Sequence, residues 1–93
     1  MFKSLEELVN IIRERKNSNS KKSYTNKLIN NKKMCIEKVH EETNELVEAI
    51  QNNNNQIHEA ADVLYHLLVL LESNGIKIED VMQELTKRQN AVR

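Results

Sequence analysis

Two pairs of acidic residues have the type and spacing needed to bind a divalent cation. Glu42 and Glu45 lie in one stretch of helical character, Glu59 and Asp62 lie in the next, and each pair is spaced three residues apart. Residues three apart share one face of a helix, so each pair projects two carboxylates in the same direction. Asp62 leads directly into residues 63–71, the most apolar run of the chain. Because an unpaired charge is costly to bury, these carboxylates predict a metal site.

The ligand types indicate which metal would bind. Mg²⁺ prefers hard oxygen ligands, as does Mn²⁺, and helical bundles build such sites from the side chains of facing helices. The chain has no Cys/His set with zinc spacing. His66 follows Asp62 by four residues rather than a glutamate by three, so it does not complete the Glu-x-x-His motif of di-iron bundles. We therefore predict that Mg²⁺ is the cofactor, with Mn²⁺ as the alternative.

Three neighbouring residues have less defined roles. Glu41 is predicted to be an auxiliary ligand or a group that orients water, whereas Glu48 points further from the apolar stripe, toward solvent. His66 shares a helix face with Glu59 and Asp62, so it could support the metal site or contact a ligand. The alternative for His66 is a core histidine bonded to a helix neighbour. For the acidic pairs as a whole, the alternative is an ordinary solvated helix face.

The elements that would position these residues are all predicted to be helices. The chain has 93 residues, no proline, one glycine and few aromatic residues, which indicates a single all-α domain over residues 1–93. Ser4 and Glu7 have capping-box spacing, so Ser4 is predicted to cap the first helix. The predicted helices cover residues 5–16, 24–29, 32–51, 57–73 and 78–89, with polar loops over residues 17–23 and 52–55 and a basic tail at the end.

The apolar residues predict how the helices pack. Ile36, Val39, Leu46 and Ile50 follow Cys35 on one predicted core stripe. Residues 63–71 are apolar nearly all round, and such a helix must be covered on most of its sides. A chain this short cannot supply all of that cover. We therefore predict a small antiparallel bundle of four main helices that is completed by dimerisation with a second copy.

Charge and composition narrow the class of function. The formal net charge is zero, which predicts neither a nucleic-acid partner nor a membrane partner. Seven acids and no Lys or Arg lie between residues 39 and 76, whereas nine cations lie between residues 13 and 38. This pattern suits a metal together with a phosphate-bearing ligand. A single cysteine, the absence of a signal peptide, and an apolar run shorter than the about 20 residues of a membrane span predict a soluble cytoplasmic protein.

Two central segments carry a resemblance to a known family. Residues 38–45 read Lys-Val-His-Glu-Glu-Thr-Asn-Glu, and residues 58–71 contain the run Asp62-Val63-Leu64-Tyr65-His66. Together they resemble phosphoribosyl-ATP pyrophosphohydrolase, a member of the all-α NTP pyrophosphohydrolase superfamily. The outlying segments 14–16, 23–28 and 84–88 resemble it too, so the likeness covers nearly the whole chain. The sequence departs from the family pattern at His40 and near Asn30, where the family usually has glycine.

The resemblance implies a reaction and roles for individual residues. The reaction is Mg²⁺-dependent hydrolysis of phosphoribosyl-ATP to phosphoribosyl-AMP and pyrophosphate, the second step of histidine biosynthesis. Glu42, Glu45, Glu59 and Asp62 would hold the metal, and Glu41 or Glu45 would orient or deprotonate the attacking water. The residues expected to contact the small-molecule nucleotide are Lys38, Arg15, Lys33, Lys87, Arg88 and His66.

Two other functions are compatible with the same residues. The metal motif is shared across the superfamily, so a nucleotide pyrophosphatase that clears surplus or non-standard NTPs would use the same carboxylates. A catalytically inactive helical dimer that serves as an interaction module is the second alternative. It would bind no Mg²⁺, whereas both enzymes require the metal.

Overall fold

In the computed structural model, which describes residues 1–18 and 23–90, every regular element is an α-helix. The helices are α1 (Lys3–Lys16), α2 (Tyr24–Ile29), α3 (Lys32–Gln51), α4 (Gln56–Ser73) and α5 (Ile78–Gln89). The all-α prediction is confirmed, and apart from the start of α1 each predicted boundary lies within one residue of the observed one. Residues 19–22 of the predicted loop and residues 91–93 of the predicted basic tail lie outside the described residues. No helix in the described ranges is long and apolar enough to span a membrane.

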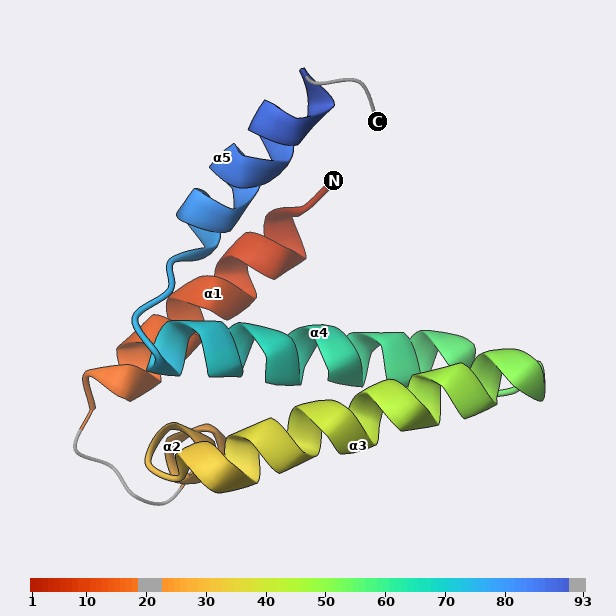
Figure 1. Cartoon of the computed structure of the whole chain (residues 1–93). Helices are drawn as coiled ribbons and strands as arrows, with labels where there is room; N and C mark the ends of the chain where they lie inside the picture. The colour runs from red at the N-terminus through yellow and green to blue at the C-terminus, as the bar shows by residue number, and fades with distance from the viewer. Residues whose placement is uncertain (19–22, 91–93) are drawn as a thin grey trace.

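The centre of the fold is an antiparallel hairpin of α3 and α4, which lie side by side along most of their length (Figure 1). A short asparagine-rich turn joins them. Asn53 and Asn55 have positive φ angles of 52° and 59°, a left-handed conformation that asparagine tolerates better than most residues. The turn therefore reverses the chain without glycine and sets the middle of α3 against the first half of α4.

The core lies at the open end of this hairpin, where α1 and α2 pack near the start of α3 and the C-terminal half of α4. Its buried residues come from four helices: Val9, Ile12, Leu28, Cys35, Leu68 and Val69. The short helix α2 is fixed at its start by Ser23, whose Oγ accepts a hydrogen bond from the backbone N–H of Asn26 at 3.0 Å. This core anchors one end of the hairpin and leaves the acidic half of α4 outside it.

Helix α5 leaves the end of α4 and runs beside α1, away from the α3–α4 pair (Figure 1). Gly75 has a φ of +74°, and the N–H of Ile76 bonds the carbonyl of Leu71 at 2.9 Å, which is a Schellman motif. Arg13 of α1 then bonds both Glu72 at the end of α4 and Glu79 at the start of α5. The four main helices do not close around one core within a single chain. The prediction is thus confirmed for the helical class, while its closure by a second copy stays a prediction.

Two predicted details are wrong. Helix α1 begins two residues earlier than expected, with Phe2 at the N-cap and no side-chain capping bond, so Ser4 does not cap it. Ile36 and Ile50 are exposed, at 38% and 59%, whereas Ala49 is buried. The reason is that α3 packs chiefly against α4, with the short α2 as its only other main neighbour in the described chain, and one helix covers only a narrow stripe of its neighbour.

Candidate metal centre

The middle of α3 presents three carboxylates at one place. Atoms of Glu41, Glu42 and Glu45 lie within 4.8 Å of one another, a consequence of their i,i+1 and i,i+3 spacing on one helix. Glu42 is the most enclosed of them, at 8% exposure, because its side chain is directed toward α4. Glu41 and Glu45 are more accessible.

The first half of α4 supplies a matching group. Atoms of His58, Glu59 and Asp62 also lie within 4.8 Å of one another. His58 Nε2 lies 3.4 Å from Asp62 Oδ2. His58 is absent from the predicted ligands, although its spacing of four residues before Asp62 would have placed it on the same face. It is largely exposed, so it borders the cluster on the solvent side.

The hairpin joins the two groups into one acidic cluster. Burial raises the pKa of Glu42, and the nearby carboxylate of Glu45 raises it further. Partial burial likewise raises the pKa of Glu59, again followed by the influence of Glu45. Asp62 contributes to the raised pKa of both groups. Carboxylates of the two helices therefore influence one another across the α3–α4 contact, while their role as metal ligands stays a prediction.

Two oxygen atoms of this cluster have no partner. Glu42 Oε2 and Glu59 Oε2 are buried and accept no hydrogen bond. Within residues 1–18 and 23–90, no Lys or Arg forms an ion pair with Glu42, Glu45 or Glu59. A buried oxygen that carries charge without a donor is costly. The donor set is all oxygen, apart from His58 at the edge, so these residues fit a hard divalent cation such as Mg²⁺ or Mn²⁺.

His66 lies behind the cluster in the interior, at 5% exposure. Its Nδ1 bonds the backbone carbonyl of Asp62 at 2.8 Å, and its Nε2 bonds the hydroxyl of Tyr24 at 2.9 Å. Both ring nitrogens are thus occupied by the protein itself, as expected for a core histidine bonded to a helix neighbour. A direct contact of His66 with substrate stays a prediction.

The predicted phosphate-binding cations are placed unequally. Lys38 lies one turn before the cluster and pairs with Glu41 at 3.3 Å, so its ammonium group is at the edge of the site. Lys33 is on the first turn of α3, about 14 Å along the helix axis from Glu42 at 1.5 Å per residue. Arg15 lies on the exposed surface of α1.

The remaining two cations are on α5, which runs away from the α3–α4 pair (Figure 1). Arg88 Nε bonds Glu84 of its own helix at 3.1 Å. Lys87 is exposed beside it. Within the described part of one chain, the fold therefore brings Lys38 to the carboxylates and leaves Lys87 and Arg88 apart from them.

Comparison with known proteins gives one consistent family. The family model described as phosphoribosyl-ATP pyrophosphohydrolase matches residues 5–89. A protein of Clostridium novyi named phosphoribosyl-ATP pyrophosphatase is 41% identical over 91 residues, which cover 95% of this chain and 83% of the relative. Its namesake in Clostridium acetobutylicum is 42% identical with the same coverage, and that in Methanococcoides burtonii is 36% identical over 92% of each chain. The similarity spans both halves of the acidic cluster.

Proposed function

The chain belongs to the phosphoribosyl-ATP pyrophosphohydrolase family, and on that premise we propose that it hydrolyses phosphoribosyl-ATP. Water adds across the α–β phosphoanhydride, the bridging P–O bond breaks, and the products are phosphoribosyl-AMP and pyrophosphate. This reaction would make the chain a hydrolase acting on a phosphoanhydride in the second step of histidine biosynthesis. We place it in the cytoplasm, where its buried and unpaired Cys35 would stay reduced.

The observation that carries this proposal is the unpartnered carboxylate cluster. Glu42, Glu45, Glu59 and Asp62 would hold Mg²⁺, with Mn²⁺ as the alternative, and the buried oxygens of Glu42 and Glu59 would gain the cation that they lack. Bound there, the metal would neutralise phosphate charge that grows as the anhydride breaks. The four carboxylates that would hold the cation come from two helices that the short asparagine turn joins.

A carboxylate beside these ligands would accept the proton of the attacking water. Glu45 is a neighbour of both Glu42 and Glu59, so it is placed to serve as ligand and base. Glu41 is exposed and pairs with Lys38, so it can reach water from the solvent side. We propose that Glu45 or Glu41 orients the water and accepts its proton.

Cations at the rim would hold the phosphates of the substrate. Lys38 is the best placed, because its ammonium group lies at the edge of the carboxylate cluster rather than inside it. Arg15 lies on α1 and Lys33 on the first turn of α3, while Lys87 and Arg88 lie on the divergent helix α5. The latter two would serve the substrate if a second copy brings its α5 to this site.

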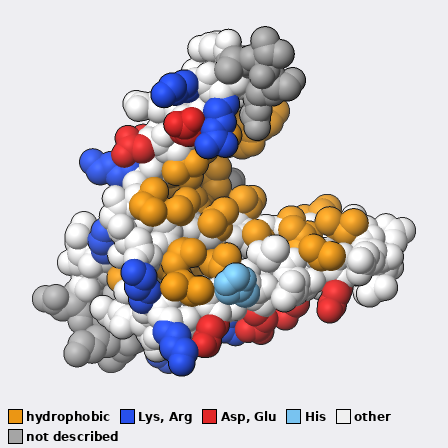
Figure 2. Space-filling model, viewed as in Figure 1, with side chains coloured by type: hydrophobic (Ala, Val, Ile, Leu, Met, Phe, Trp, Pro, Cys, Tyr) orange, Lys and Arg blue, Asp and Glu red, His pale blue; other side chains and the backbone are white. Residues whose placement is uncertain are grey.

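We also propose that the active form is a homodimer. Figure 2 shows apolar side chains gathered in the angle that α1 and α5 form with α4, open to solvent in the single chain. A groove of about 660 Å³ runs between α1 and α5, lined by apolar side chains such as Phe2, Leu5 and Met82. Leu64 and Leu67 of α4 are also exposed. A second copy of this chain would cover these surfaces, as the all-round apolar run of α4 predicts.

The test of the proposed reaction is pyrophosphate release in the presence of Mg²⁺ from phosphoribosyl-ATP, ATP and each common dNTP. We expect kcat/KM to be highest for phosphoribosyl-ATP. A higher kcat/KM for a dNTP would keep the metal site and assign the chain to nucleotide clearance. No release from any of these substrates would support the inactive interaction module.

A further inference from the structure

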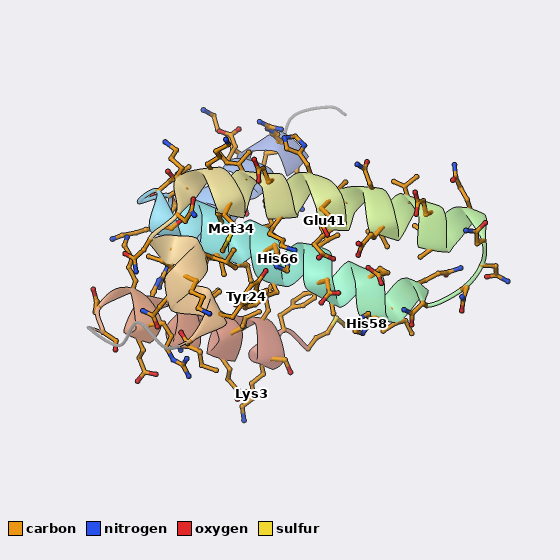
Figure 3. All side chains as sticks on the ribbon, turned by 90° about the horizontal axis from the view of Figure 1, so that it is seen from below. Lys3, Tyr24, Met34, Glu41, His58 and His66 are labelled. Carbon is orange, nitrogen blue, oxygen red and sulfur yellow. The ribbon has the colours of Figure 1, made fainter. Side chains whose placement is uncertain are left out.

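Helix α2 is attached to α4 by two neighbouring side-chain hydrogen bonds. Tyr24 Oη lies 2.9 Å from His66 Nε2, and the next residue, Thr25, has its Oγ1 2.5 Å from Tyr65 Oη. Figure 3 shows Tyr24 and His66 side by side, with Glu41 further along the same face. Both bonds join neighbouring residues of α2 to neighbouring residues of α4. Only the bond to His66 connects onward to a residue of the acidic cluster, because His66 also bonds the backbone of Asp62.

The bond from Tyr24 fixes the orientation of the buried imidazole. A carbonyl can only accept, so His66 Nδ1–H donates to the backbone carbonyl of Asp62 at 2.8 Å. In the neutral ring, Nε2 then accepts the hydroxyl proton of Tyr24. Edge contacts enclose the ring further, with centroids 5.8 Å from Tyr24 and 5.0 Å from Tyr65. Both ring nitrogens are thus hydrogen-bonded, and both tyrosine rings contact the imidazole.

The held ring lies beside the candidate metal ligands. It bonds the backbone carbonyl of Asp62 one turn earlier on α4, and it is one of the groups whose proximity influences the pKa of the buried Glu42 on α3. A displaced ring would therefore disturb the packing behind ligands on both helices. Groups that orient metal ligands from behind in this way affect metal affinity, even though they never touch the ion.

We propose that Tyr24 is a positioning residue for the metal centre, acting through its hydrogen bond to His66. This inference rests on the proposed function for the identity of the metal. Removing the Tyr24 hydroxyl leaves a buried acceptor on His66 without a donor, and the ring can regain one only by turning away from Asp62. The ligands on α3 and α4 then lose their common support.

The test is Mg²⁺ affinity measured by isothermal titration calorimetry without substrate. Tyr24→Phe removes the hydroxyl and keeps the ring, and we expect it to raise the dissociation constant about 10-fold. Thr25→Val is the matched control, because it removes the neighbouring α2–α4 hydrogen bond with little change in shape. We expect its dissociation constant to stay within about twofold of wild type. Urea unfolding of both variants separates affinity from stability.

A second variant keeps the test decisive if Tyr24→Phe folds poorly. In His66→Asn, the side-chain amide can still bond the Asp62 carbonyl but is too short to reach Tyr24. We expect it to weaken Mg²⁺ binding as Tyr24→Phe does, and the double variant to be no weaker than either single one. Equal affinities of Tyr24→Phe and wild type, or equal losses in Tyr24→Phe and Thr25→Val, would overturn the positioning role alone. Absence of Mg²⁺ binding in wild type would overturn the metal centre as well.

Discussion

Glu42 is the residue whose environment is hardest to explain without a metal. Its side chain is enclosed between α3 and α4, its Oε2 has no hydrogen-bond partner, and its nearest charged neighbours include other carboxylates. A fold selected for stability alone would be better served by an amide or an apolar group at this position. This unfavourable burial of an unpaired carboxylate is confined to the place where the two helices carry their acidic pairs.

We therefore predict opposite effects of Glu42→Gln on activity and on stability. Losing a ligand charge should lower kcat/KM for phosphoribosyl-ATP by about 1000-fold, because several kcal/mol of charge stabilisation depend on the metal. The metal-free variant should be as stable as wild type or up to about 1 kcal/mol more stable, because a buried unpaired charge is removed. Glu48→Gln, an exposed carboxylate on the same helix, is the control and should change neither quantity. A clearly destabilised Glu42→Gln with intact turnover would contradict the assignment.

For individual residues, the sequence predicts contacts where the two residues are close together in the same helix. The i,i+3 spacing of each acidic pair is enough to predict that its members share a face, and each pair forms a close group on its own helix. The pKa values of Glu42 and Glu59 show that carboxylates of the two helices also influence one another. The bond between Tyr24 and His66 joins residues 42 positions apart, so only the fold reveals it. His58 lies between these cases, because its spacing to Asp62 is local but its contact depends on the rotamer.

Helix α4 ends in a backbone conformation that suits glycine. Gly75 has φ of +74°, and no atom lies within 4 Å of the position that a Cβ would take. Gly75→Ala should therefore lower the free energy of unfolding by about 1 kcal/mol through backbone strain alone. Gly75→Asn should cost less, since asparagine tolerates the left-handed region. Urea denaturation gives both values, and an Ala variant as stable as wild type would contradict the Schellman end of α4.

Arg13 of α1 bonds residues of both α4 and α5, and this link predicts that the stability of the fold depends on pH. The Arg13 guanidinium lowers the pKa of Glu79 from 4.5 to about 2. Because the folded-state pKa is lower than the unfolded one, the stabilisation is present above pH 4.5 and is lost as the pH falls toward about 2.

Urea midpoints of wild type and Glu79→Gln, measured between pH 2 and 6, check this link. Wild type should unfold at higher urea than the variant at pH 6, and the difference should disappear near pH 2. Since Glu79 is exposed, the difference will be small. A difference that stays constant over this pH range would show that Glu79 stabilises α5 by packing rather than by charge.

The positions of the helices can be predicted closely from the sequence, whereas their exact ends are predicted less well. Apolar periodicity places all five helices, and Asn74 with Gly75 marks the end of α4. Ser4 was the expected cap of α1, but the helix starts before it and Phe2 occupies the cap. Local hydrogen bonds that compete at a helix start are nearly equal in energy, so a shift of the cap by two residues is easily produced by packing of the first turn.

For the whole molecule, the open angle between α1–α5 and α4 is the feature that composition cannot predict. The described part of the chain buries few large side chains completely, namely Ile12, Leu28, Val69 and Cys35, and exposes many others. Periodicity shows that a helix is apolar on a face but not which partner covers it. That is why Ile36 and Ile50, predicted as core, are exposed in the single chain.

We predict that the protein sediments as a dimer at micromolar concentration, because two copies could cover the apolar groove between α1 and α5. Sedimentation velocity at several concentrations measures this directly. Met82→Glu, at the groove, should shift the population toward monomer, and Glu37→Gln, on the exposed surface of α3, is the control. Wild type that stays monomeric throughout this range would contradict the dimer.

We propose that four carboxylates from α3 and α4 form the metal centre of this phosphoribosyl-ATP pyrophosphohydrolase. The measurement that tests this assignment is the rate of pyrophosphate release from phosphoribosyl-ATP by wild-type protein as Mg²⁺ is titrated into chelator-treated enzyme. The rate should rise from background to a plateau with Mg²⁺ and return to background when chelator is added in excess. Turnover that is unaffected by removal of the metal would contradict the claim.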